Sequence, residues 1–169
     1  MRFSFHERQL LRAATGWLEL GNPDEAFNEL EKITPFHRAH PDVLKLRWRI
    51  YDSAGKHQSA FGVAQGLSRL LPDDAEPFVW RSYSARRMKG GGLGLALELL
   101  LDVVNDFPGE PILPFNIACY HCQRGDLNEA KTWLHTAYEV AGRNGTLRYW
   151  KTKTLDDDDL AELRKQNAL

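Results

Sequence analysis

The sequence predicts an all-α chain built as a stack of helix hairpins. The first observation is a glycine followed five residues later by an alanine, which occurs four times with the alanines 34, 36 and 34 residues apart. A fixed period near 34 residues is typical of a helix-turn-helix repeat. The second observation is apolar spacing of three and four residues, with no sustained period-two alternation, so we expect no sheet. The four pairs are Gly21–Ala26, Gly55–Ala60, Gly91–Ala96 and Gly125–Ala130.

The clearest hairpin covers residues 112–137. Helical spacing runs through Ile117, breaks at Gly125 and resumes at once. Asp126 with Glu129, three residues later, is an N-cap signature for the second helix. The apolar faces of both helices cannot be buried within one hairpin, so we expect neighbouring hairpins to stack.

Start and stop signals place the first four helices. Ser4 and Glu7 form a capping-box pattern at the start of the first helix. Asn22 followed by Pro23 and two acids starts the second, and Pro41 opens the third. The expected helices cover about residues 5–20, 23–34, 41–54 and 57–71.

The next four helices follow from prolines and glycines. An acid-rich segment ending at Pro77 opens the fifth helix, and the glycine run 90–92 ends it. Pro108 stops the sixth, and Pro111 with Pro114 frames the start of the seventh. The expected helices cover about residues 73–89, 93–107, 111–124 and 127–142.

Residues 143–169 depart from the repeat. A short helix is expected near residues 146–152, and the acidic run 156–159 leads into a last amphipathic helix that ends with Arg164 and Lys165. Stacked repeats need a cap because a terminal unit has only one neighbour. We therefore expect this segment to cover the open apolar edge of the last hairpin.

The hairpins resemble the tetratricopeptide repeat (TPR) family. The matching residues are Ala14-Trp17 with Ala26-Leu30-Ile33, Trp48-Tyr51 with Ala60-Ala64-Leu67-Pro72, Trp80-Tyr83 with Ala96-Leu100-Val103-Pro108, and Ile117-Ala118 with Ala130-Leu134-Ala137. The resemblance covers roughly residues 10–142. It implies a right-handed α-solenoid of about four TPR-like hairpins, at about residues 5–40, 41–73, 74–109 and 110–142, with a C-terminal capping segment at 143–169. Such repeats carry many unrelated roles, so the resemblance predicts the fold more than the function.

Composition bounds the class of protein. Of the 169 residues, 43% are hydrophobic and 27% are charged, which is typical of one globular domain or a short array. A formal net charge of −1 gives no overall attraction to nucleic acid or to an anionic membrane. Two cysteines cannot make a disulfide framework, and charges precede any apolar run long enough for a signal peptide. We expect a soluble cytoplasmic protein.

The Cys119-x-x-Cys122 pair has the spacing of a redox or metal site. It lies inside a predicted helix, and no second cysteine pair completes a zinc site. Because cysteine is among the residues most often buried, we interpret both thiols as structural. The glycine run at 90–94 lacks the lysine and the preceding strand of a phosphate loop. We therefore expect no catalytic residue, no metal and no cofactor.

The surface expected to carry function is the concave side of the solenoid. In the resembled family, the first helix of each hairpin lines a groove that commonly holds an extended peptide or a partner helix. The noncore positions of those helices give a modestly basic groove here, and guanidinium groups bind carboxylates through two hydrogen bonds. The predicted ligand is an acidic segment or a C-terminal carboxylate of a protein partner. The groove residues are Arg8, Arg12, Thr15, Lys45, Arg49, Asp52, Arg81, Ala85, Met88, Asn116, Cys119 and Gln123.

The sequence thus favours a non-catalytic adaptor. The arginines and Lys45 would anchor charge, Asn116 would bond a peptide backbone, and Met88 would make an adaptable apolar contact. A solvated helix face would carry the same charges, so that interpretation stays open. A small chaperone would instead expose an apolar groove that shields a segment of its partner. A thiol or metal enzyme would centre on Cys119, Cys122 and His121, and self-association through the repeat edges is also open.

Overall fold

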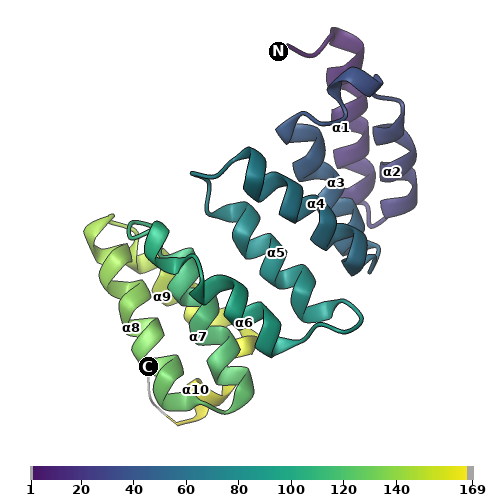
Figure 1. The fold of residues 1–169 in the computed structure, drawn as a ribbon. Helices are drawn as coiled ribbons and strands as arrows, with labels where there is room; N and C mark the ends of the chain where they lie inside the picture. The colour runs from purple at the N-terminus through teal and green to yellow at the C-terminus, as the bar shows by residue number, and fades with distance from the viewer. Residues whose placement is uncertain (1, 167–169) are drawn as a thin grey trace.

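A computed structural model describes residues 2–166. These residues form ten α-helices and three short 3-10 turns, arranged in chain order as a row of helix hairpins (Figure 1). The α-helices are α1 (Phe5–Glu19), α2 (Pro23–Glu31), α3 (Pro41–Ser53), α4 (His57–Leu70), α5 (Glu76–Arg87), α6 (Leu93–Leu101), α7 (Ile112–Arg124), α8 (Leu127–Arg143), α9 (Leu147–Asp156) and α10 (Ala161–Lys165). The 3-10 turns are η1 (Pro35–His37), η2 (Val104–Asp106) and η3 (Asp158–Leu160).

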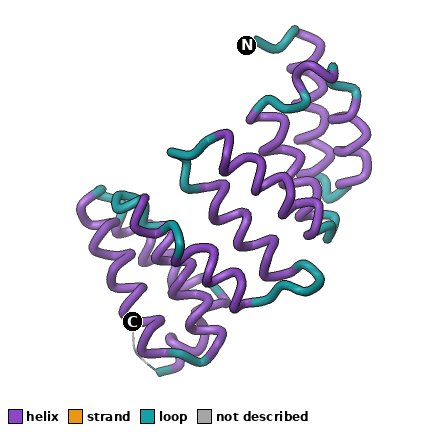
Figure 2. Tube along the Cα trace, in the orientation of Figure 1, coloured by secondary structure: helices purple, strands orange, loops and turns teal. Residues whose placement is uncertain are grey.

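The four predicted hairpins are confirmed as α1–α2, α3–α4, α5–α6 and α7–α8. All four of their turns contain a glycine with positive φ, which is 75° at Gly21, 69° at Gly55, 77° at Gly90 and 85° at Gly125. Only glycine adopts this backbone region without strain, which explains why the hairpins are punctuated by glycine. Figure 2 shows helices joined by loops, with no strand in residues 2–166. No helix within this range is long and apolar enough to cross a bilayer.

The apolar core lies between consecutive hairpins as well as within them. The first cluster takes Leu10 from α1, Leu30 from α2 and Ile50 from α3. The stacking expected from the sequence is therefore confirmed. The repeated alanines have no exposed surface, and a side chain this small lets the two helices of a hairpin approach closely. These alanines are Ala26, Ala60, Ala96 and Ala130.

Two helices end earlier than the sequence pattern suggests. α2 stops at Glu31 and α6 stops at Leu101, whereas we expected them to reach Thr34 and Phe107. Each of these two expected end residues precedes a proline and has non-helical backbone. The ring of a following proline disfavours the helical conformation, so these segments close with i→i+3 hydrogen bonds instead, from Ile33 to Leu30 and from Asp106 to Val103.

The predicted helix caps hold in part. Ser4 and Glu7 form the expected capping box, and the Asn22 side chain accepts a hydrogen bond from the amide of Glu25. Asp126 occupies the N-cap position of α8, but its side chain makes no capping hydrogen bond, so that expectation was wrong. Its carboxylate instead lies 3.3 Å from Nε of Arg124, at the end of the preceding helix.

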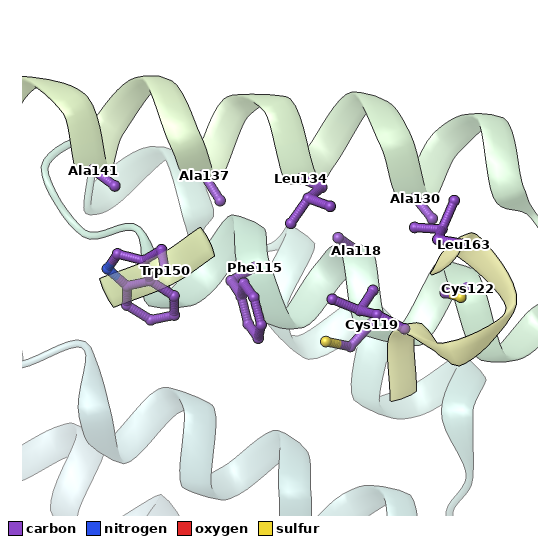
Figure 3. Packing of buried hydrophobic residues seen from close by; sticks show 11 residues of the cluster. Phe115, Ala118, Cys119, Cys122, Ala130, Leu134, Ala137, Ala141, Trp150 and Leu163 are labelled. Atoms are coloured by element: carbon purple, nitrogen blue, oxygen red, sulfur yellow. The ribbon is translucent and has the colours of Figure 1, made fainter. Parts of the chain in front are cut away.

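The C-terminal segment caps the stack, as predicted. We call α9, η3 and α10, residues 147–165, the tail. The Trp150 ring lies 5.0 Å from the Phe115 ring of α7, and Leu160 and Leu163 are fully buried in the same cluster (Figure 3). The tail therefore packs on α7 as well as on α8, and residues 113–120 of α7 are all buried.

Candidate functional site

Hollows open along the side of the molecule that α1, α3, α5 and α7 form, which we call the inner face. One has a volume of about 690 Å³ and lies between α5, α7 and the tail; we call it the tail cleft. Most of its lining is polar or charged, so it suits a polar ligand better than a hydrocarbon. The lining residues are Tyr83, Arg86, Arg87, Asn116, Tyr149, Thr152, Lys153, Asp156, Asp157, Asp158 and Asp159.

Arg86 holds a carboxylate at one side of the tail cleft. Its two terminal nitrogens donate to the two Asp159 oxygens at 2.6 and 3.3 Å, which is the bidentate geometry of an arginine–carboxylate pair. The Gln123 amide donates to the same carboxylate and accepts from Arg86 at 2.5 Å. Burial opposes the charge on Arg86, but the bond to Asp159 outweighs it and raises the arginine's pKa. We call Arg86 and Gln123 the carboxylate clamp.

Asn116 has both ends of its amide engaged within the protein. The amide oxygen accepts from the Tyr83 hydroxyl at 2.7 Å, and the amide nitrogen donates to the Ile112 carbonyl at 2.7 Å. The residue is only 4% exposed. Burial is also the main reason that the pKa of Tyr83 is raised, so the phenol remains a neutral donor. Asn116 thus positions Tyr83 at the cleft, and its predicted bond to a peptide would have to replace these contacts.

Ion pairs connect the tail cleft to the rest of the inner face. Arg87 lies 3.6 Å from Asp52 of α3 and stacks over the Tyr83 ring. On the tail side, Lys153 lies 3.6 Å from Asp157. The cleft therefore presents both signs of charge, with the cations on α5 and α9 and the carboxylates on the tail.

Four of the six predicted residues of α1 and α3 line two smaller hollows, which we call the N-terminal hollows, whereas Arg8 and Asp52 line neither. One, about 240 Å³, is lined by Leu11, Thr15, Asp42, Lys45, Leu46 and Arg49. The other, about 280 Å³, is lined by Leu11, Arg12, Thr15, Gly16 and Glu19. Both combine guanidinium groups with an apolar floor at Leu11.

The cations of the N-terminal hollows differ in their partners. Lys45 lies 2.9 Å from Asp74 and 3.6 Å from Glu76, and the bond to Asp74 raises its pKa. Arg12 and Arg49 are exposed and form no ion pair within residues 2–166. Arg8 is exposed and donates to the Phe3 carbonyl at 2.5 Å. The cations of the N-terminal hollows that are open to a ligand are therefore the guanidinium groups of Arg12 and Arg49.

Two predicted residues of α5 lie elsewhere. Arg81 is half-buried with its guanidinium over the Phe78 ring, and the charges that act on it are those of Asp102, just after α6, and Arg69 of α4. Burial lowers its pKa. Met88 lies just after α5, in the turn at residues 88–92, beside the turn that leads into α4. Neither side chain reaches the tail cleft.

The spacing between Ala60 and Ala96 is 36 residues, two more than the other spacings, and the place of these two extra residues explains where the α5 side chains lie. The turn after α5 has five residues, 88–92, whereas the turns after α1 and α3 have three. The extra length therefore follows α5 and does not precede it. Counting 34 residues on from Arg49 and Asp52 leads to Tyr83 and Arg86, which the sequence reasoning missed. The glycine run in that turn was the signal that could have found them.

The thiol and metal hypothesis gains little from the geometry. Cys119 and Cys122 are each 2% exposed, and burial raises the pKa of the Cys119 thiol well above its usual value. Nδ1 of His121 lies 3.5 Å from a carboxylate oxygen of Asp126, in the turn after α7. Cys119 does lie near Asp157 and Asp159, close enough to share an ion. These carboxylates already face Lys153 and the carboxylate clamp, which offset their charge.

Comparisons with known proteins identify the fold. No protein-family model matches the chain, and no curated protein matches its sequence. A solved structure, MamA 41-end from Desulfovibrio magneticus RS-1, is 15% identical over 98% of this chain and 98% of that chain, with a TM-score of 0.63. The MamA RS-1 ArsTM double mutant is 14% identical over 82% of this chain and 76% of that chain, with a TM-score of 0.64. At these identities the likeness shows the fold alone, a TPR-type helical repeat.

Proposed function

We propose that this chain is a non-catalytic protein-binding module whose inner face receives an acidic segment of a partner protein. The observation that carries the proposal is the pair of exposed guanidinium groups at Arg12 and Arg49, which have no ion-pair partner in residues 2–166 and flank the N-terminal hollows. Charged side chains on both sides of an apolar floor fit a segment that alternates carboxylates with apolar residues.

The carboxylate clamp supports the same chemistry further along the face. There Arg86 and Gln123 bind a carboxylate of the chain itself, with the arginine in bidentate geometry. Such pairs give specificity because the planar fork fits two oxygens at once. An extended segment running from the N-terminal hollows toward the tail cleft would pass Arg87 on the way.

Catalysis is not part of the proposal. The tail cleft holds arginines, a lysine, tyrosines and carboxylates, yet its two partly buried carboxylates, Asp157 and Asp159, are engaged in ion pairs and the nearby Cys119 thiol is buried with a raised pKa. A nucleophile, a base within reach of it and a group that orients the base do not come together there.

The test is co-purification from an extract of the protein's own cells. The variant Arg12→Glu/Arg49→Glu reverses the two exposed cations of the N-terminal hollows. Its control, Arg69→Glu/Lys131→Glu, makes the same change in net charge at exposed positions on α4 and α8, which do not form the inner face. We expect a partner that binds the wild type and the control, is lost from the first variant, and binds less well as salt rises.

A partner retained equally by both variants would overturn this proposal. Circular dichroism of both variants must match the wild type, so that a lost partner reports a lost contact. The partner's binding segment can then be located by titrating synthetic peptides, and the proposal expects the binding peptides to be rich in aspartate or glutamate.

A second candidate, a small chaperone for an apolar segment, is favoured by exposed apolar side chains on and beside α1. Phe5 is 71% exposed and Leu20 is 77% exposed. A Phe5→Ser/Leu20→Ser variant in the same co-purification separates the two functions. Loss of the partner from that variant, with retention by Arg12→Glu/Arg49→Glu, would favour the chaperone.

A further inference from the structure

The acidic run at the end of α9 is not a uniformly solvated turn. The Asp158 side chain is 105% exposed, whereas those of Asp157 and Asp159 are 24% and 27% exposed. Asp159 reaches into the inner face, where the carboxylate clamp holds it. One carboxylate of the tail is therefore bound in the way that the proposed function expects of a partner's carboxylate.

Two leucines extend this contact. Leu160 directly follows Asp159, Leu163 comes three residues later, and neither has any exposed surface. Both belong to the cluster that contains Cys119 and Cys122 of α7 (Figure 3). The sequence Asp-Leu-x-x-Leu thus places one carboxylate in the clamp and two apolar side chains against α7, which is how an amphipathic segment binds a groove.

The two parts of the tail are held differently. α9 is anchored by the buried side chains of Trp150 and Thr154. Beyond it, the Arg164 guanidinium donates to the Asp157 carbonyl, within residues 157–165, and to the Thr154 carbonyl of α9. Residues 157–165 reach the hairpins mainly through the aspartate in the clamp and the two leucines. Side-chain contacts from Arg164 to Thr154 and from Lys153 to Asp157 join them to α9. They thus form a short unit that can leave the inner face while α9 stays in place.

We propose that residues 157–165 are an internal ligand of the inner face, displaced by a partner segment of the same chemistry: an aspartate followed by leucines one and four positions later. The inference rests on the proposed function, because it takes the inner face as the partner-binding surface. The internal ligand lowers the apparent affinity for the partner, since only molecules with an empty clamp bind it. Once residues 157–165 are displaced, the partner segment can extend along the inner face from the N-terminal hollows to α7.

The test uses a fluorescent peptide with the sequence of residues 156–165, titrated into full-length protein and followed by anisotropy. Asp159→Asn weakens the internal ligand, and Asp158→Asn is the matched control because it makes the same charge change at a fully exposed neighbour. We expect Asp159→Asn to bind the peptide about tenfold more tightly than the wild type and the control. Adding Arg86→Ala to Asp159→Asn should abolish that gain, since it removes the clamp.

A second measurement needs no variant. Hydrogen exchange of the wild-type protein should become faster at the amides of residues 160–165 when excess unlabelled peptide is added, and should stay unchanged in α9. Equal peptide affinity for wild type, Asp159→Asn and Asp158→Asn, with no change in exchange at residues 160–165, would overturn the internal ligand. The proposed function would then still be judged separately by the co-purification with Arg12→Glu/Arg49→Glu, which does not involve the tail.

Discussion

Trp48 of α3 and Trp80 of α5 are stacked, with ring centroids 4.6 Å apart and an angle of 6° between the rings. The indole nitrogen of Trp48 also donates to the Ser84 hydroxyl at 3.0 Å, and the residue is 7% exposed. Lys45 lies 5.9 Å above the Trp80 ring, at the edge of the N-terminal hollows. The stack therefore joins the second hairpin to the third and fixes how the two halves of the inner face meet.

Removal of the buried indole should destabilise the whole stack. We expect Trp48→Ala to lower the free energy of unfolding by about 3–5 kcal/mol, because it leaves a large cavity and removes the indole donor from Ser84, whose hydroxyl keeps its bond to the Trp80 carbonyl. Urea denaturation followed by far-ultraviolet circular dichroism measures the change. Trp17→Ala is the control, since Trp17 is 38% exposed, and we expect it to cost about 1 kcal/mol or less. Similar losses from both variants would contradict the role of the stack.

Glycine substitutions should change stability in opposite directions at two places. A Cβ atom at Gly91 would lie 1.8 Å from the Ala85 carbonyl oxygen, so Gly91→Ala must shift the backbone of the five-residue turn. Gly62 lies within α4, and a Cβ there would meet no atom within 4 Å. We therefore expect Gly91→Ala to lower the melting temperature. We expect Gly62→Ala to raise the free energy of unfolding by about 0.5–1 kcal/mol, since alanine is the better helix former.

The sequence predicts the helices well where local signals decide the structure. The capping box at Ser4, the proline after Asn22 and the glycine turn at Gly55 act within a few residues, and all three elements are present. Helix ends near proline were less accurate, because tighter 3-10 turns replaced the final helical turn before Thr34 and Phe107. Those turns depend on the tertiary path of the chain, which the local pattern does not contain.

The inner face was predicted only in part, for a related reason. Thr15, Lys45 and Arg49 meet in one hollow because α1 and α3 follow the 34-residue period. Arg86 was missed because the two extra residues of the third hairpin fall after its first helix. The clamp also depends on Asp159, which comes from a segment 73 residues further along the chain. A contact of that kind follows from the path of the tail and has no signal in the repeat.

The two cysteines should be unreactive in the folded protein. Cys119 and Cys122 are buried, and burial raises the pKa of the Cys119 thiol well above its usual value, which keeps it protonated and a poor nucleophile. We expect Ellman's reagent to modify both thiols only after denaturant is added. A Cys119→Ala/Cys122→Ala variant should retain the co-purified partner. Rapid modification of the folded protein, or loss of the partner from this variant, would instead favour the thiol hypothesis.

Glu7 forms the buried polar centre of the first hairpin. It is 4% exposed, and its carboxylate accepts hydrogen bonds from His37 and Thr34 at 2.7 Å each and from the Ser4 amide at 2.9 Å. The bond to His37 is the main reason, and the bond to Thr34 the next, that the pKa of Glu7 lies far below its usual range. Because η1 reaches α1 through this carboxylate, the site ties the connection after α2 back to the first helix.

The depressed pKa predicts how stability depends on pH. In the unfolded chain Glu7 takes up a proton near pH 4.5, whereas the folded protein stays ionised there. The contribution of Glu7 is therefore fully present above that pH, and the free energy of unfolding should fall as the pH drops below it. Glu7→Gln should be less stable at pH 7 and should lose part of this acid dependence. Urea denaturation at several pH values between 2 and 7 measures both effects.

Glu19→Gln, at an exposed position of the same helix, should keep the acid dependence of the wild type. Parallel stability curves for Glu7→Gln and the wild type would show that Glu7 does not supply this energy.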